Sequence, residues 1–369
     1  MARVDSVTNA GGAGVEAINF DLVSAADYPG WLQERVGKAQ NRVILQAMEI
    51  AYDSTTQPLF DDLVQIAEDD KVTVRLVADA YSTLFSDALP FVQPNLRKAY
   101  QGWRDTRKFG TFMMRLKEAG GEATTINRYL FAGRGLLRFH PWANRNHMKG
   151  AVVDDWVALG GGVNLSGDAF SNKDFMLFAK HPSLANWFDA LTKHEAAARE
   201  LDLTTDFRVP IDETTQLLVD VGAPGQSIIY DTVCATAERN DIVGIKFVSQ
   251  MRPSGRLEKI LAERQDALGA DAIRISINDH SQFRHPARLQ EFLNAYNPQM
   301  IVHKPTDDSF IHAKAVIFTR ADGKKMSISG SHNFNERGVQ YGTGELAICT
   351  TNPDTVAQIE AFFDTLPVC

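Results

Sequence analysis

The chain has 369 residues, of which 44% are hydrophobic and 23% are charged, and its formal net charge at pH 7 is −8. This composition is typical of a soluble globular protein long enough for two domain-sized halves. No stretch reaches the roughly 18 apolar residues of a membrane-spanning helix, and the acidic balance disfavours a dedicated nucleic-acid binder.

In the first half of the chain, predicted helices alternate with predicted strands. Apolar residues at helical spacing predict helices at residues 31–36, 59–66 and 113–119. Apolar or alternating runs predict strands over residues 42–50 and 72–77.

The second half repeats this order. Helices are predicted over residues 228–239, 257–261 and 289–295, and strands over 241–248 and 272–277. Strands that alternate with helices favour an α/β architecture in which the core sheet of each half is mixed but mostly parallel. We expect the halves, residues 1–205 and 206–369, to meet near a polar stretch that contains Pro210.

Three cysteines show no metal-ligand spacing, and such a sparse odd number argues against a disulfide framework. Residues 1–17 also lack the charged-then-apolar layout of a secretory signal. We therefore expect a reducing, cytoplasmic location.

A short motif occurs twice, with its histidines 165 residues apart, at His147 and His312. The first copy is His147-Met148-Lys149, then Asp154 and Gly161-Gly162-Val163-Asn164; the second is His312-Ala313-Lys314, then Gly330-Ser331-His332-Asn333. Each copy supplies an imidazole, an ammonium and an amide. Two such sets facing each other would form a pocket for one phosphodiester.

Each His-x-Lys precedes an apolar run, at residues 151–153 and 315–318, that predicts a strand. Side chains two residues apart lie on the same face of an extended chain, which explains the single intervening residue. A hairpin would then return the Gly-x-Asn segment beside the His-Lys pair, where glycine allows close approach of the backbone.

These motifs resemble the signature of the phospholipase D superfamily, His-x-Lys-x4-Asp-x6-Gly-(Gly/Ser)-x-Asn, and look most like its cardiolipin-synthase branch. The first copy fits every position, whereas the second has Thr319 at the Asp position and a longer hairpin. The resemblance spans both halves. It implies the phospholipase D fold, with one active site at the interface between the halves, no cofactor and no metal.

The resemblance also implies a division of labour. A neutral imidazole attacks phosphorus and forms a phospho-histidine, a second histidine protonates the leaving alkoxide, and Lys149 and Lys314 stabilise the charge on the phosphoryl oxygens. By analogy His147 is the nucleophile and His312 the general acid, although the near-symmetry of the two sets leaves the reverse order open.

Each histidine also needs a partner that fixes its tautomer. The family places a carboxylate after the Gly-x-Asn turn, and the candidates are Asp174 and Glu345. The alternative for both is a strand-end cap. The family implies that Asp154 is structural, so its replacement by Thr319 need not abolish catalysis.

Five further residues are candidates for binding the substrate. Glu49 and Gln250 follow equivalent strands in the two halves, where ligands of α/β sheets bind, although ordinary surface is an equal alternative. The others lie in or beside the motifs: Gly162, Ser331 and Arg145.

A basic cluster precedes the first motif. Residues 97–149 hold twelve Lys and Arg against three acids, a local charge of +9 that leaves −17 for the remainder. The early strands of the two halves align when Val43 is matched with Ile242, an offset of 199 residues, whereas the motif histidines are 165 residues apart. The first half therefore has 34 extra residues between its early strand and its motif. Two segments, residues 81–94 and 127–146, are rich in aromatic side chains; arginines accompany them in the second.

These features leave three functions open. The first is a phospholipase D-type enzyme that hydrolyses or transfers the phosphatidyl group of phospholipids, with peripheral contact to the inner face of an anionic membrane. The second is a metal-independent nuclease of the same superfamily, which the basic and aromatic segments would serve. The third is a non-catalytic binding module, which two intact motifs disfavour. The oligomeric state stays open.

Overall fold

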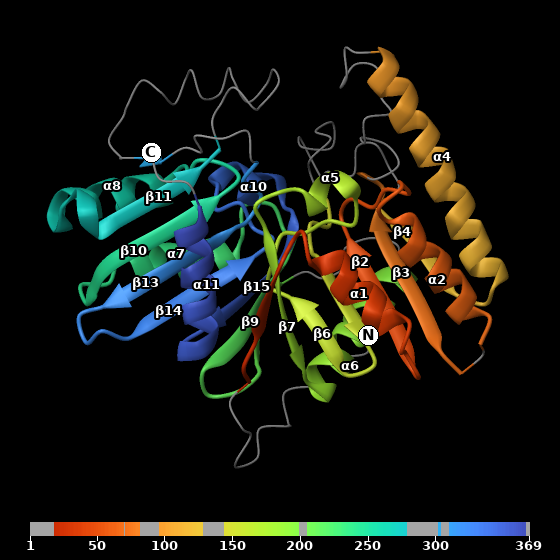
Figure 1. The fold of residues 1–369 in the computed structure, drawn as a ribbon. Coiled ribbons are helices and arrows are strands. Elements are labelled where there is room, and N and C mark those ends of the chain that lie inside the picture. Colours follow the sequence, from red (N-terminus) through yellow and green to blue (C-terminus); the bar gives the residue numbers. More distant parts are fainter. Residues whose placement is uncertain are drawn as a thin grey trace.

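The computed structural model describes residues 18–69, 71–81, 96–127, 144–198, 205–278, 302–303 and 310–366. Two mixed sheets lie next to each other, one from each half of the chain, and helices cover their outer faces (Figure 1). The α/β class and the two homologous halves are therefore confirmed. The boundary between residues 205 and 206 stays a prediction.

The first sheet has seven strands. Their order is β1 (Asp21–Ser24), β7 (Phe175–Lys180), β6 (Trp156–Leu159), β5 (Gly150–Val153), β2 (Arg42–Ala47), β3 (Thr73–Asp79) and β4 (Glu122–Ile126).

The second sheet has eight strands. Their order is β12 (Val302–His303), β11 (Ile273–Ile277), β10 (Ile242–Ser249), β13 (Ala315–Arg320), β14 (Lys325–Gly330), β15 (Gly344–Thr350), β9 (Thr215–Val221) and β8 (Phe207–Pro210).

The two orders correspond strand for strand, with β8 added at one edge. Among the described strands, only β2-β3-β4 and β10-β11-β12 pair in parallel; all other pairs are antiparallel. The expected predominance of parallel strands is thus wrong. The strands that follow each motif, β5-β6-β7 and β13-β14-β15, are consecutive neighbours, and short connections can join only antiparallel strands.

Helices complete the fold. They are α1 (Tyr28–Val36), α2 (Gln57–Ala67), α4 (Leu96–Glu118), α5 (Gly167–Phe170), α6 (Pro182–Ala198), α7 (Ile228–Ala237), α8 (Arg256–Leu268), the 3-10 turn η3 (Ala270–Ala272), α10 (Glu336–Tyr341) and α11 (Pro353–Thr365). No helix among the described residues is long and apolar enough to cross a bilayer.

The predicted elements in the described ranges are present, with boundaries shifted by a few residues. Among the strands the largest shift is at β2, which ends at Ala47 rather than at residue 50, and helix α8 continues to Leu268, beyond the predicted end at residue 261. The helix predicted over residues 113–119 is the end of the much longer α4. The helix predicted over residues 289–295 lies outside the described residues.

Three hydrophobic cores hold the layers together. One packs the first sheet against α1, α2 and α4, and another packs the second sheet against α7 and α8. The third joins both sheets with α6 and α11. On β13, Val316 and Phe318 face the outer core while Ala315 and Ile317 face the central one. The halves therefore share buried surface, where each fully buried large apolar side chain contributes ~1.5–3 kcal/mol.

Strand β1 and helix α11 close the seam between the halves, which faces the viewer in Figure 1. The Phe20 N–H donates to Thr355 Oγ1 at 3.0 Å, and the Leu22 N–H donates to Gln358 Oε1 at 2.8 Å. Thr355 also lies at the start of α11, where the Asn352 side chain accepts its N–H. The first strand of one half is thus bonded to the final described helix of the other.

Asp154 has the structural role expected of it. Its carboxylate accepts the backbone N–H groups of Gln40, Asn41 and Arg42, which lead into β2. Thr319, at the matching place in the second half, instead pairs through its backbone with Gly244 on β10.

We expect Asp154→Ala to lower the free energy of unfolding by about 1–3 kcal/mol, because three backbone donors lose a charged acceptor. Thr319→Ala is the matched control and should change that free energy by less than about 1 kcal/mol. Urea denaturation measures both. Equal losses in the two variants would show that Asp154 has no special structural role.

Candidate active site

The two motif histidines lie where the halves meet. Each precedes a strand, and each is bonded through its backbone to the other half. The His147 N–H donates to the Gly344 carbonyl at 2.7 Å, and the His312 N–H donates to the Lys173 carbonyl at 3.0 Å. Gly344 is followed by Glu345, and Lys173 is followed by Asp174. The two backbone bonds therefore hold each histidine close to a carboxylate of the other half.

Those carboxylates bind the histidines across the interface. His147 Nδ1 lies 2.9 Å from Glu345 Oε2, and His312 Nδ1 lies 2.7 Å from Asp174 Oδ2. An ionised carboxylate only accepts, so each Nδ1 carries the proton and Nε2 carries the lone pair of the neutral ring. The predicted carboxylates are thus placed at their histidines, and the pairing is crossed between the halves.

Each carboxylate is held in turn by its own half. Glu345 accepts the Ser331 hydroxyl, as well as Thr343 Oγ1 at 3.0 Å. Asp174 Oδ1 accepts two backbone N–H groups, from Gly162 at 3.3 Å and from its successor Phe175 at 2.8 Å. A Cβ atom at Gly162 would come within 2.6 Å of Asp174, so the backbone reaches the carboxylate only because this residue is glycine.

Two buried lysines stand beside the histidines. Lys149 and Lys314 are each 1% exposed, and each ammonium donates to the backbone carbonyl of its own motif histidine. Burial lowers the pKa of Lys149 to about 7 and that of Lys314 to about 8, against the pull of nearby carboxylates. The site therefore concentrates positive charge that has been removed from water.

The histidines are kept neutral at neutral pH. Burial, followed by the charge of a neighbouring lysine and opposed by the carboxylate, lowers the pKa of His147 to about 4 and that of His312 to about 4. Burial by itself raises the pKa of Glu345, but the charge of His147 and its hydrogen bond outweigh it and lower this pKa to about 2. A neutral imidazole beside an ionised carboxylate is the form that can act as nucleophile or base.

The two motif asparagines lie at matching places but make different contacts. Asn164 Oδ1 accepts the Glu49 N–H at 3.4 Å. Asn333 Oδ1 is buried and has no hydrogen-bond partner among the described residues, and its backbone carbonyl accepts Ser249 Oγ at 3.0 Å. Its amide oxygen is the free acceptor of the pair.

Three of the expected substrate-binding residues have internal contacts instead. Ser331 and Gly162 hold the carboxylates, as described above. Arg145 is fully buried, and its guanidinium lies 3.3 Å from Asp79 and 3.0 Å from the Asn127 carbonyl. These polar groups are used to build the site, so we now assign them positioning roles.

The other two expected binding residues differ from each other. The negative charge of Glu49 acts to raise the pKa of Lys149, so its carboxylate lies within electrostatic range of that ammonium. The Gln250 carbonyl accepts Asn278 Nδ2 at 3.0 Å, but no hydrogen bond among the described residues joins the Gln250 side chain to the motif histidines.

A pair of strand-end residues was missed from the sequence. Asp79 ends β3 and accepts the Asn146 N–H at 2.8 Å; Asn278 follows β11 and accepts the Ile311 N–H. Each thus anchors the residue before a motif histidine. Their position at the ends of equivalent strands was the available signal, and the same argument had selected Glu49.

Glu195 on α6 was also missed. Its buried carboxyl accepts Gln46 Nε2 at 2.8 Å and Nδ2 of Asn146, the residue before His147, at 3.0 Å. Burial raises the pKa of Glu195 to about 8. An acid in an amphipathic helix carries no local sign that it turns inward, so this contact needed the structure.

The loops expected to choose the substrate fall mostly outside the described residues. These are residues 82–95 and 128–143, which include most of the two aromatic segments. The end of α4 presents part of the basic cluster as exposed side chains, and Arg115 there pairs with Asp61 at 3.1 Å. Within the described ranges, no group of three His, Cys, Asp or Glu side chains is arranged to hold a metal ion.

Comparisons with known proteins agree with this geometry. A family model described as "Cardiolipin synthase, PLD-like domain" matches residues 32–195 and 228–366, which is more than half of the chain. No curated protein gives a significant sequence match.

Two solved structures share the fold over nearly the whole chain. The phosphatidylserine synthase of Haemophilus influenzae Rd KW20 has a TM-score of 0.67 at 14% identity, with 98% of this chain and 88% of that one covered. The polyphosphate kinase of Porphyromonas gingivalis has a TM-score of 0.57 at 11% identity, with 94% of this chain covered but only 50% of the kinase. The chain belongs to the phospholipase D superfamily, whose enzymes act on phosphodiesters, within the family that the cardiolipin synthase model describes.

Proposed function

We propose that the protein is a phospholipase D-type phosphodiesterase that hydrolyses or transfers the phosphatidyl group of phospholipids through a phospho-histidine. The observation that carries this proposal is the crossed pairing of His147 with Glu345 and of His312 with Asp174. It provides two oriented imidazoles at one interface, with two ammonium groups beside them.

In the first step the lone pair on His147 Nε2 attacks phosphorus, and the bond from phosphorus to the leaving alkoxide breaks. His312, which takes up a proton on Nε2 when the anionic diester binds, gives that proton to the alkoxide and becomes neutral again. Lys149 and Lys314 stabilise the negative charge on the phosphoryl oxygens as the transition state forms. The Asn333 amide, whose oxygen has no hydrogen-bond partner among the described residues, is available to orient the substrate.

In the second step neutral His312 takes a proton from water or from an alcohol, whose oxygen then attacks phosphorus. The phosphorus–nitrogen bond to His147 breaks, and the ring returns to its neutral form. Water yields the phosphomonoester and an alcohol yields a new diester. The choice between hydrolysis and transfer is therefore a competition for one intermediate.

The description of the matching family model supports a lipid substrate, as does the name of the phosphatidylserine synthase that shares the fold. We also propose peripheral contact with an anionic membrane, through the basic cluster that precedes the first motif. Cleavage of nucleic-acid diesters by the same chemistry is the competing outcome of the test below.

Purified protein incubated with phosphatidylglycerol, with and without glycerol, should release phosphatidic acid by hydrolysis or form cardiolipin by transfer, as resolved by thin-layer chromatography. His147→Ala should reduce the rate by at least about 10³-fold, because the covalent route is removed. Cleavage of single-stranded DNA in chelator with no lipid turnover would replace the lipid substrate by nucleic acid.

The order of the histidines can be tested by trapping. With a ³²P-labelled aryl phosphodiester, whose leaving group needs little protonation, His312→Ala should accumulate a labelled protein that His147→Ala does not form. Peptide mapping should place the label on His147. A label on His312 in the His147→Ala protein would reverse the two roles.

Substrate binding should take up a proton between about pH 4 and pH 6.5. Burial and the lysine charges hold the pKa of His312 at about 4, below the ordinary value near 6.5. A bound diester monoanion offsets the lysine charge, so it raises that pKa and the complex holds more protons than the free protein. Diethyl phosphate keeps its charge over this range, and calorimetry in buffers of different ionisation enthalpy measures the uptake.

In this experiment the affinity for diethyl phosphate should rise as the pH falls through the window, and His312→Asn should reduce the uptake. Binding without any proton uptake by the unmodified protein would contradict the general-acid role.

A further inference from the structure

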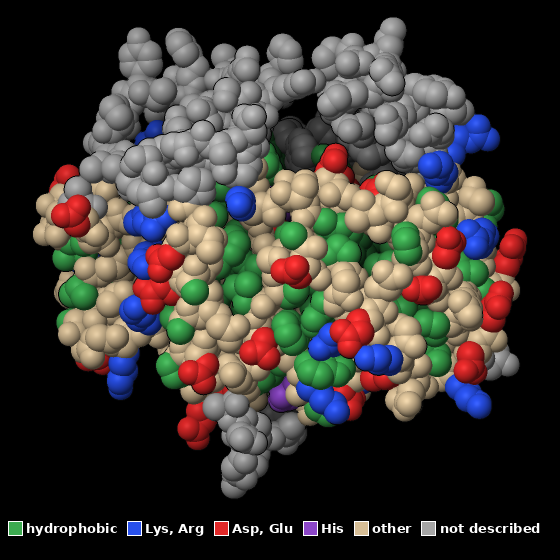
Figure 2. Space-filling view, viewed as in Figure 1, with side chains coloured by type: hydrophobic (Ala, Val, Ile, Leu, Met, Phe, Trp, Pro, Cys, Tyr) green, Lys and Arg blue, Asp and Glu red, His purple; other side chains and the backbone are tan. Residues whose placement is uncertain are grey.

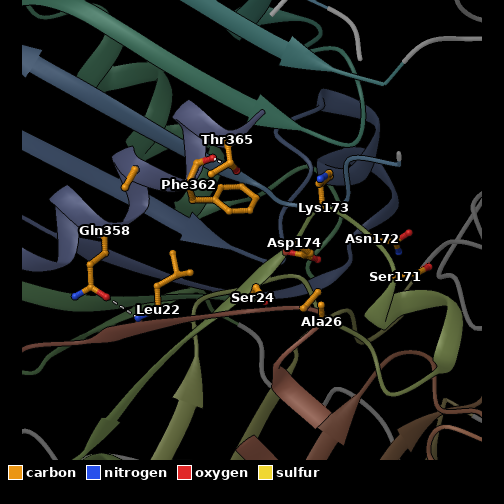
Figure 3. A pocket seen from close by; sticks show the side chains of 12 residues that line it. Leu22, Ser24, Ala26, Ser171, Asn172, Lys173, Asp174, Gln358, Phe362 and Thr365 are labelled. Carbon is orange, nitrogen blue, oxygen red and sulfur yellow. Dashed lines mark hydrogen bonds between the residues drawn. The ribbon is translucent and has the colours of Figure 1, made fainter. Parts of the chain in front are cut away.

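A pocket of about 550 Å³ opens on the seam between the halves. It lies between β1 and α11 and reaches the segment just before β7, as Figure 3 shows. Its volume is within the range of roughly 300–1,000 Å³ that is usual for small-molecule sites. In Figure 2, hydrophobic side chains gather in the middle of this face, over the seam.

Most of the surface that lines the pocket is apolar, although serine, asparagine, glutamine and threonine side chains also reach it, and one end holds a lysine. Leu22 and Ala26 come from β1 and the turn that follows it, and Ala361 and Phe362 come from α11. Lys173 lines the end that approaches the active site. The pocket therefore offers a mainly apolar surface with a lysine side chain at the end nearest the active site.

The same end of the pocket touches the catalytic machinery. Asp174 contributes to the lining, but its carboxylate is turned inward to His312 and is 2% exposed. The Lys173 carbonyl accepts the N–H groups of His312 and Ala313, both at 3.0 Å. A molecule in this pocket would thus end next to the residues that fix the general acid.

We propose that this pocket binds one acyl chain of the phospholipid substrate, with Lys173 contacting the anionic region of the same lipid. The proposal rests on the proposed function, and it names a subsite for that function. An acyl chain matches the apolar walls because it removes apolar surface from water without leaving polar groups unpaired. The Lys173 ammonium matches the negative charge that a phospholipid carries next to its chains.

Ala361→Trp tests this proposal because it fills the pocket at an exposed helix position. Ala357→Trp is the matched control, since Ala357 is exposed one turn earlier on α11 and does not line the pocket. Both variants should keep the thermal midpoint of the unmodified protein within a few degrees. Turnover is measured on phosphatidylglycerol with long acyl chains, on its four-carbon-chain analogue and on bis(4-nitrophenyl) phosphate.

Ala361→Trp should lower kcat/KM for the long-chain lipid by about tenfold or more, mainly through KM, because several methylenes lose their contact. It should change kcat/KM for the aryl diester and the four-carbon lipid by less than about twofold, and Ala357→Trp should affect none of the three. Lys173→Gln should lower kcat/KM for the long-chain lipid and leave the thermal midpoint unchanged. Equal effects of Ala361→Trp on long and short chains would overturn the acyl-chain assignment and leave the proposed function intact.

Direct binding separates failure of this proposal from failure of the function. If the unmodified protein cleaves the aryl diester but no phospholipid, the lipid function fails, and calorimetry with long-chain lysophosphatidic acid still tests the pocket. Binding that Ala361→Trp weakens at least tenfold would support the acyl-chain site. Lack of binding, or equal affinity for glycerol 3-phosphate, would overturn it and indicate an anion contact only.

Discussion

The crossed hydrogen bonds between histidine and carboxylate are the interaction on which the rest of the site depends. Neither half contains a complete catalytic set, because the carboxylate that fixes each ring belongs to the other half. The backbone bonds at Gly344 and Lys173 place those carboxylates, and the central core holds the two sheets close enough for the bonds to form. The geometry of the proposed active site therefore depends on the packing of the two halves.

The same interface collects charges that a protein interior disfavours. Two lysines and two carboxylates are almost completely removed from water there. Removing one partner from a buried pair typically costs about 3–5 kcal/mol, because the other charge is left uncompensated. Burial also changes the protonation of these groups, because it lowers the pKa of both lysines and both histidines. In the proposed function, a bound phosphodiester adds negative charge next to the two ammonium groups.

The motif residues could be predicted from the sequence because their chemistry is local. A His-x-Lys before a strand and a Gly-x-Asn after a hairpin are short patterns, and the structure brings both sets together. The pairing of each carboxylate with the histidine of the other half could not be predicted. The residues around Asp174 carry no local signal that it binds His312, 138 residues away. Arg145 was expected to bind substrate because it lies beside the first motif, but its guanidinium pairs with Asp79 on a strand that is distant in sequence. The antiparallel majority of strand pairs follows from hairpins that the sequence did indicate.

The ties between distant residues set the order in which the protein becomes functional during synthesis. Domains generally fold as they leave the ribosome, starting with the N-terminal one. Here the Phe20 N–H bonds to Thr355, which is synthesised 335 residues later, and His147 pairs with Glu345, which is synthesised 198 residues later. A nascent chain that has folded only its first half therefore has no carboxylate to orient the His147 ring. It also has no helix α11 against strand β1. The pair of His147 with Glu345 can form only after Glu345 has been synthesised, so a shorter nascent chain would lack the proposed active site.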